Sequence, residues 1–425
     1  MKSLFKKLNR DGLLTHSVLV MFLLHTASAA NLVFHMAMGR LLAPADYGVL
    51  AAMLGAFFIF YTPLFFSIQN TIAHFSRHLL EEGHLTDVRF MVWHWTKKCA
   101  AIGLPVLLIA LLCSHPLSVG FHLESVWPVI LISVILFVSV FMPVFAGAFQ
   151  GMQRFGWMAA ASQSWSLIRL GVAVPLLVWL SPTVECALIA QLFGVLICVW
   201  IGLRALCRVI PSSVPSGKPL EHAGGYFFGS LTALFFYSVL MNADIVMVKL
   251  FFPDEAAYGP YARASVIGRM IVFISQPIVG ALFPKVVARK GMTAESLNAL
   301  FRALALSLFL VGGLVGIFSI FPQLPLGALF GEFHPSAELV VTMRWVIWGM
   351  APLSLIFLIM NFELAQNRFS SLFPLGLFSM VFVVGFSTHH PAPVWAAIWL
   401  LLAALGTLLS LVVLVAVQKK REGGG

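Results

Sequence analysis

The side chains best suited to chemistry are arginines that interrupt long apolar stretches. There are four of them: Arg169, Arg263, Arg269 and Arg344. A guanidinium group binds phosphate oxygens in a bidentate manner, and a charge inside a membrane-type apolar helix usually faces an internal cavity. We therefore predict that these arginines contact an anionic ligand. The alternative is that they pair with other protein groups and hold helices together.

One carboxylate, that of Asp244, lies deep within an apolar stretch. It is either a coupling-ion site or the permanent partner of an arginine, and the excess of arginines over carboxylates in these stretches favours the second reading. With 3.6 residues per turn, Arg269 and Gln276 share a helix face with Ser265, whereas Arg263 points about 120° away. Arg269 is therefore the better cavity candidate, and Gln276 joins the predicted ligand contacts.

A polar stripe on the first apolar stretch adds His25 and Asn31 to this set, because both fall on the same arc of a helix. Histidine titrates near physiological pH, so His25 is a candidate for a proton-linked role. An ordinary hydrogen bond between helices is the alternative.

Signatures of catalysis and of nucleotide or metal binding are missing from the sequence. There is no GxxxxGK[ST] loop, no HExxH and no CxxC pair among the five cysteines. We expect a protein that is not an enzyme and that uses no metal or cofactor.

Composition indicates the environment in which these side chains must be placed. Hydrophobic residues make up 60% of the 425 residues, charged residues only 10%, and the mean hydropathy is +0.97. A soluble domain carries roughly 25% charged residues. The fold class we predict is an all-α polytopic membrane protein of about twelve transmembrane helices.

Apolar runs of a length that crosses a bilayer define the expected spans. They are 13–38, 49–73, 99–115, 127–148, 158–180, 185–205, 223–250, 259–283, 300–321, 337–361, 371–388 and 394–417.

The distribution of Lys and Arg predicts the orientation of these spans. Twenty of the 26 basic residues fall on connections that share one side, two on the other side, and four inside spans. Cytoplasmic loops carry the excess of Lys and Arg, so both the N- and the C-terminus are expected in the cytoplasm. The net charge of +10 is thus a consequence of topology, and we expect no nucleic-acid partner.

The chain is expected to form two lobes, an N-lobe of residues 1–205 and a C-lobe of residues 223–425. The Pro- and Ser-rich segment 206–222 would be a cytoplasmic linker between six spans on either side.

Two pairs of similar segments support a duplication. Residues 39–48 resemble residues 249–259, with Tyr47 and Tyr258 at an offset of 211, and residues 149–156 resemble residues 363–370, with an offset of 214. Because each half has six spans, the repeats are expected to be parallel, related by an axis along the membrane normal.

These segments also resemble a known family. Residues 39–50, Gly-Arg-Leu-Leu-Ala-Pro-Ala-Asp-Tyr-Gly-Val-Leu, resemble the G-R-x-L-G-P-x-x-Y-G element of oligosaccharide and polysaccharide flippases, with Ala43 in place of a usual glycine. The turn at 150–156 and the stretch 244–262 are similar to elements of the same family. It belongs to the multidrug/oligosaccharidyl-lipid/polysaccharide exporter superfamily.

The resemblance implies a flippase of the bacterial inner membrane. Such a protein moves a polyprenyl-pyrophosphate-linked oligosaccharide from the cytoplasmic to the periplasmic leaflet by alternating access. Its expected partners are the lipid-linked glycan, membrane lipid and, in addition, a glycan polymerase or glycosyltransferases.

Two alternatives stay open. One is a cation-coupled exporter of small molecules or drugs from the same superfamily, which would need acidic rather than basic cavity residues. The other is a membrane subunit of an exopolysaccharide secretion complex. A membrane-embedded polymerase is disfavoured, since the longest expected outer loop, 322–336, has only 15 residues.

Overall fold

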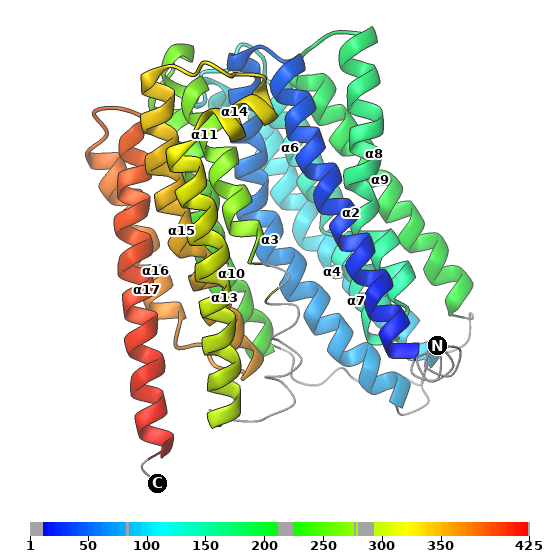
Figure 1. Ribbon diagram of the computed structural model, residues 1–425. Coiled ribbons are helices and arrows are strands. Elements are labelled where there is room, and N and C mark those ends of the chain that lie inside the picture. Colours follow the sequence, from blue (N-terminus) through cyan, green and yellow to red (C-terminus); the bar gives the residue numbers. More distant parts are fainter. Residues whose placement is uncertain (1–11, 82–84, 211–223, 276–277, 279–292, 424–425) are drawn as a thin grey trace, which may run out of the picture. The chain divides into compact units, whose positions relative to one another are not determined.

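The computed structural model describes residues 12–81, 85–210, 224–275, 278 and 293–423, and all regular elements in these ranges are helices (Figure 1). The chain divides into two units, each made of several chain segments. Unit 1 contains residues 1–41, 64–119 and 124–227, and unit 2 contains residues 42–63, 120–123 and 228–425.

Unit 1 is built from the helices of the first half of the chain. They are α2 (Gly12–Leu41), the second part of α3 (Pro44–Glu81), α4 (Leu85–Leu112), α5 (Ser114–Gly120), α6 (Trp127–Ser139), α7 (Met142–Gly151), α8 (Phe155–Trp179) and α9 (Val184–Val209).

Unit 2 contains the first part of α3 and the helices of the second half. They are α10 (Gly224–Phe251), α11 (Glu255–Phe273), α13 (Ala294–Ile320), α14 (Gln323–Phe330), α15 (Ala337–Ala365), α16 (Leu372–Thr388) and α17 (Val394–Gly423). The predicted lobes, 1–205 and 223–425, remain a prediction, because the units are not two continuous halves and most of the linker 206–222 lies outside the described residues.

The helices confirm the all-α polytopic fold class. Each of the twelve expected spans overlaps one helix or a consecutive pair, which is α4 and α5 for 99–115 and α6 and α7 for 127–148. Among the described residues, nine helices are long and apolar enough to cross a membrane. Beyond these nine, α16 has only 17 residues, and α11 carries both Arg263 and Arg269. The break between α6 and α7 precedes Pro143, whose ring lacks the N–H that a continuous helix needs.

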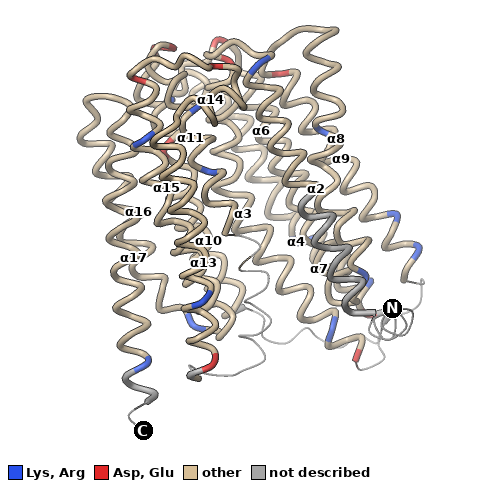
Figure 2. The backbone as a smooth tube through the Cα atoms, viewed as in Figure 1, with Lys and Arg blue, Asp and Glu red and all other residues tan. Residues whose placement is uncertain are grey.

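Charged side chains lie mainly near helix ends. In Figure 2, the basic residues of α9 lie toward its C-terminal end, as does the basic residue coloured on α17. The long middle parts of both helices carry none. The cytoplasmic position of the two termini stays a prediction.

The duplicated turn has the same backbone geometry in both units. Gln153 and Asn367, at an offset of 214, both have a left-handed backbone, with φ of 57° and 58°. In each turn the N–H of the following arginine donates to a carbonyl five residues earlier, Arg154 to Phe149 at 2.8 Å and Arg368 to Glu363 at 2.9 Å. This is the pattern that closes a helix C-terminus, so the repeat seen in the sequence is also a repeat of local structure.

The two copies of the other duplicated segment, residues 39–48 and 249–259, pack against each other. A Cβ added at Gly48 would lie 2.5 Å from the ring of Tyr258, and one added at Gly259 would approach Pro44 at 3.7 Å. All four residues belong to unit 2. The Tyr-Gly pair is therefore a packing element, in which the glycine of the first copy makes room for the tyrosine of the second.

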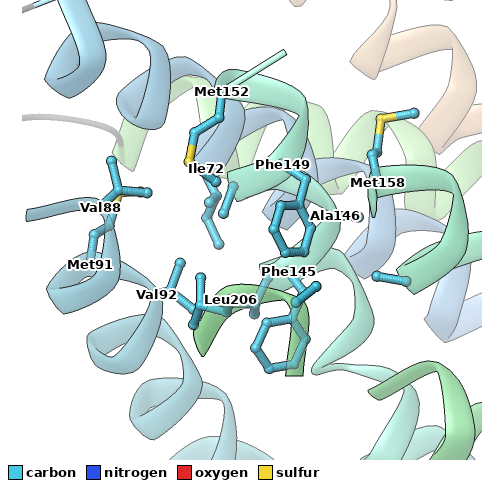
Figure 3. Packing of buried hydrophobic residues seen from close by; sticks show 14 of the residues in the cluster. Ile72, Val88, Met91, Val92, Phe145, Ala146, Phe149, Met152, Met158 and Leu206 are labelled. Carbon is cyan, nitrogen blue, oxygen red and sulfur yellow. The ribbon is translucent and has the colours of Figure 1, made fainter. Parts of the chain in front are cut away.

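The core of unit 1 forms around α7. Phe145 and Phe149 point into a cluster that includes Ile72 of α3, Val92 of α4 and Leu206 of α9 (Figure 3). One face of α7 thereby packs against α3, α4 and α9 through apolar contacts, which dispersion forces stabilise.

Close contact between α7 and α3 depends on two glycines spaced four residues apart. A Cβ at Gly147 would lie 2.5 Å from the carbonyl oxygen of Gln69, and one at Gly151 would lie 2.5 Å from Cβ of Ser76. Small residues at this spacing allow helix backbones in a membrane to approach closely. The approach also brings Gln69 within 2.7 Å of Gln150, to which it donates a hydrogen bond.

Replacing Gly151 by alanine is expected to lower the free energy of unfolding by about 1–3 kcal/mol, because the new methyl group also meets the backbone carbonyl of Ala73, which cannot move aside. Thermal unfolding in detergent measures this. Gly156→Ala is the matched control, since nothing lies within 4 Å of its added Cβ, and it should be neutral or slightly stabilising. Equal effects of the two substitutions would contradict the close contact.

Candidate functional site

The predicted site residues of unit 1 meet around the guanidinium of Arg169, which is 0% exposed. Its Nη1 donates to Oε1 of Gln191 at 2.8 Å and its Nη2 donates to Oδ1 of Asn31. The rings of Phe34 and Trp165 lie 3.6 Å and 4.8 Å from the guanidinium carbon. Three helices, α2, α8 and α9, thus enclose one charge.

The sequence brings these groups together by helix spacing and by one glycine. Asn31 and Phe34, three residues apart on α2, share a helix face. A Cβ at Gly194 would lie 2.6 Å from the carbonyl oxygen of Trp165. Only glycine therefore allows α9 to approach α8 closely enough for Gln191, one turn away, to reach Arg169.

Amide oxygens and aromatic faces compensate this charge, and none of the contacts described for Arg169 is with a carboxylate. Cation–π contact is worth about 2 kcal/mol when desolvated. The Nε–H group has no hydrogen-bond partner among the described residues. A ligand would reach this guanidinium only after the surrounding protein groups move, so its contact with a ligand stays a prediction.

In unit 2, Asp244 is the centre of a second polar cluster. Its carboxylate is 0% exposed and accepts hydrogen bonds from three groups of α11: Nη2 of Arg269 at 2.8 Å, Oγ of Ser265 at 2.6 Å and the hydroxyl of Tyr261 at 3.2 Å. The three donors follow one another at intervals of four residues, so they form a single stripe on the helix. The Nε–H of Arg269 also donates to the carbonyl of Met241, at 3.2 Å.

Arg263 lies on another face of α11 and pairs with a carboxylate from outside the spans. Its Nη1 is 2.5 Å from Oε2 of Glu332, and the two side chains are 18% and 28% exposed. Gly331, with a left-handed φ of 72°, ends α14 just before Glu332. Tyr47 of α3, which contacts the ring of Phe330, is close enough to Arg263 and Arg269 to interact electrostatically with both.

The remaining predicted residues do not join these clusters. Arg344 of α15 is exposed, and its Nε–H donates to the carbonyl of Ser319 of α13 at 3.0 Å. Gln276 and the side chain of His25 lie outside the described residues.

Two kinds of residue escaped the sequence analysis. The aromatic rings of Phe34 and Trp165 were indistinguishable from ordinary apolar residues, although their spacing from Asn31 and Arg169 was a usable signal. Glu363 lies just beyond the expected span 337–361, yet it is 0% exposed. It accepts bonds from the backbone N–H of Ser371 at 2.8 Å and from Gln418 at 3.2 Å.

Apolar helices long enough to span a bilayer define a multi-pass membrane protein. Solved structures share this fold. An inward-facing multidrug resistance MATE transporter of the MOP superfamily aligns with a TM-score of 0.72 at 12% identity, covering 93% of this chain and 96% of that chain. The lipid II flippase MurJ in an inward closed conformation aligns with a TM-score of 0.71 at 11% identity, covering 94% and 87%.

A sequence model of the family described as polysaccharide biosynthesis protein matches residues 14–288. The chain belongs to this family, which confirms the resemblance drawn from the sequence motifs. Its fold is that of membrane transporters rather than of enzymes. No curated protein matches the sequence.

Replacing Asp244 by asparagine should destabilise the protein by about 3–5 kcal/mol, because it leaves the guanidinium of Arg269 buried without its counter-charge. Thermal unfolding in detergent measures this. The double variant D244N/R269Q should recover much of the loss, since no unpaired charge remains. E338Q, which neutralises an exposed acid of the same unit, should shift stability by less than about 0.5 kcal/mol. Additive losses in the double variant would show that the two side chains are not coupled.

Proposed function

We propose that the protein is a flippase for a lipid-linked glycan. It moves a polyprenyl-pyrophosphate-linked oligosaccharide from the cytoplasmic to the periplasmic leaflet of a bacterial inner membrane by alternating access. The observation that carries this proposal is the cationic character of the polar groups within the spanning helices. Membership of the polysaccharide biosynthesis family supports the same class of cargo.

Unit 2 offers the guanidinium groups that suit a pyrophosphate. Among the described residues, the bonds of Arg269 use its Nε–H and Nη2 groups, so the other amino group remains for ligand oxygens. Arg269 is fixed on Asp244, and Arg263 on Glu332, which orients both fork-shaped donors before a ligand arrives.

Arg169 and Asn31 have a different part in this proposal. Because the guanidinium is enclosed by unit 1, we assign it the role of holding α2 against α8 and α9 while cargo passes. Direct contact of Arg169, Gln276 or His25 with cargo would belong to another conformational state.

A cation-coupled drug exporter is the second candidate, since the fold matches a multidrug transporter as well as a flippase. A cationic drug needs an available carboxylate. Asp244, the carboxylate described deep within the spans, is already bonded to three donors, one of them the guanidinium of Arg269. The geometry therefore supports an anionic cargo better. A glycan polymerase or glycosyltransferases would act as partners before or after the flipping step.

Transport in proteoliposomes tests the proposal, with a polyprenyl-pyrophosphate-linked oligosaccharide as cargo and ethidium as the competing cationic drug. D244N/R269Q should reduce glycan flipping at least about tenfold, the effect of losing one charge-assisted hydrogen bond, while the protein stays folded. R302Q, which neutralises an exposed arginine of α13, is the matched control and should transport normally. Ethidium movement that depends on Asp244, together with no glycan flipping by the wild type, would replace the flippase with the exporter.

A further inference from the structure

Arg344 places a charge on an exposed face of a helix that is apolar enough to span a membrane. It lies seven residues after the first residue of α15, or about 10 Å along the axis. Val341, Trp345 and Trp348 occupy the same stripe of the helix and are 47%, 40% and 53% exposed. The exposed stripe therefore extends over two helical turns and is not limited to the side chain of Arg344.

The guanidinium reaches toward the N-terminal end of α15. Side chains of a helix tilt toward its N-terminus, and a long arginine extends this tilt to bring its charge to the membrane interface. Its bond to the carbonyl of Ser319 fits this direction, because Ser319 is the residue before the last of α13, which ends at Ile320. That bond holds Nε in place and turns the two amino groups of the fork to other partners.

The surface around the guanidinium is apolar and aromatic. Ile320 is 68% exposed and Phe321 48% exposed, and tryptophans such as Trp345 and Trp348 are enriched where a membrane meets water. Within the described part of the chain, Arg344 forms no ion pair. The protein therefore presents exposed aromatic side chains and an oriented guanidinium, and the counter-ion of Arg344 would come from a molecule in the surrounding membrane.

We propose that Arg344, with Trp345 and Trp348, binds the phosphate group of a membrane phospholipid in the leaflet at the N-terminal end of α15. The charge distribution of the sequence predicts that this is the outer leaflet. The guanidinium would bind phosphate oxygens with its two free amino groups, and the exposed apolar side chains would contact the acyl chains. A glycan would find few polar partners on this surface, so a phospholipid suits it better than the cargo.

Native mass spectrometry of the delipidated full-length protein tests this proposal with phosphatidylglycerol as the probe. The R344Q variant should bind the most tightly held phosphatidylglycerol about tenfold more weakly than the wild type, and R344K should lose less. Diacylglycerol with the same acyl chains should not occupy the site in either protein. Because Arg344 is exposed, its substitution should leave the unfolding temperature unchanged, which separates lipid loss from misfolding.

Two further arms make the result decisive. R302Q removes an exposed positive charge near the opposite end of α13 and should keep the tightly held lipid. An equal loss in R302Q and R344Q would show attraction by net charge alone and overturn the site. Unchanged phosphatidylglycerol binding in R344Q would also overturn the site. If R344Q weakened the binding of polyprenyl pyrophosphate alone, Arg344 would instead belong to the transport pathway.

Discussion

Placing a guanidinium within a membrane-spanning bundle is costly unless protein groups replace its hydration, and the two units meet this cost in different ways. In unit 2, Asp244 supplies a full opposite charge to Arg269, and a hydroxyl and a phenol complete the carboxylate's hydrogen bonds. In unit 1, two amide oxygens and two aromatic faces share the charge of Arg169. The first arrangement needs α10 and α11 at a fixed distance and the second needs α2, α8 and α9, so the polar clusters and the helix packing depend on one another.

Glycine positions set those distances. Gly194 allows the approach of α9 to α8 that delivers Gln191, and Gly147 and Gly151 do the same for α7 and α3. In a lipid environment, apolar burial alone gives little preference for one helix pair over another, and close backbone contact becomes the main source of specificity. The positions of small residues therefore decide which polar side chains meet.

Much of the architecture was predictable because it follows from hydrophobic length and charge counts. The helices match the expected spans, and helical spacing alone places Ser265 and Arg269 on one face of α11, where both contact Asp244. The surroundings of each arginine were not predictable in this way. Helical periodicity predicts the face of the helix on which Arg169 or Arg344 lies, but it does not predict whether another helix packs against that face. An enclosed and an exposed guanidinium therefore look alike in the sequence. Aromatic cation partners such as Phe34 are hidden by their apolar character.

The duplicated turn shows how far two copies of one element have diverged. Phe149 and Glu363 occupy equivalent positions, both are 0% exposed, and both give their carbonyl to the same backbone bond. One copy points a phenyl ring into an apolar cluster, while the other points a carboxylate at the start of α16 and at Gln418 of α17. The backbone bond is the same in both copies, and in the second copy the carboxylate of Glu363 adds bonds from Ser370 and Ser371 to the turn. One turn geometry therefore serves two kinds of anchoring: an apolar cluster in the first copy and a polar tether to α17 in the second.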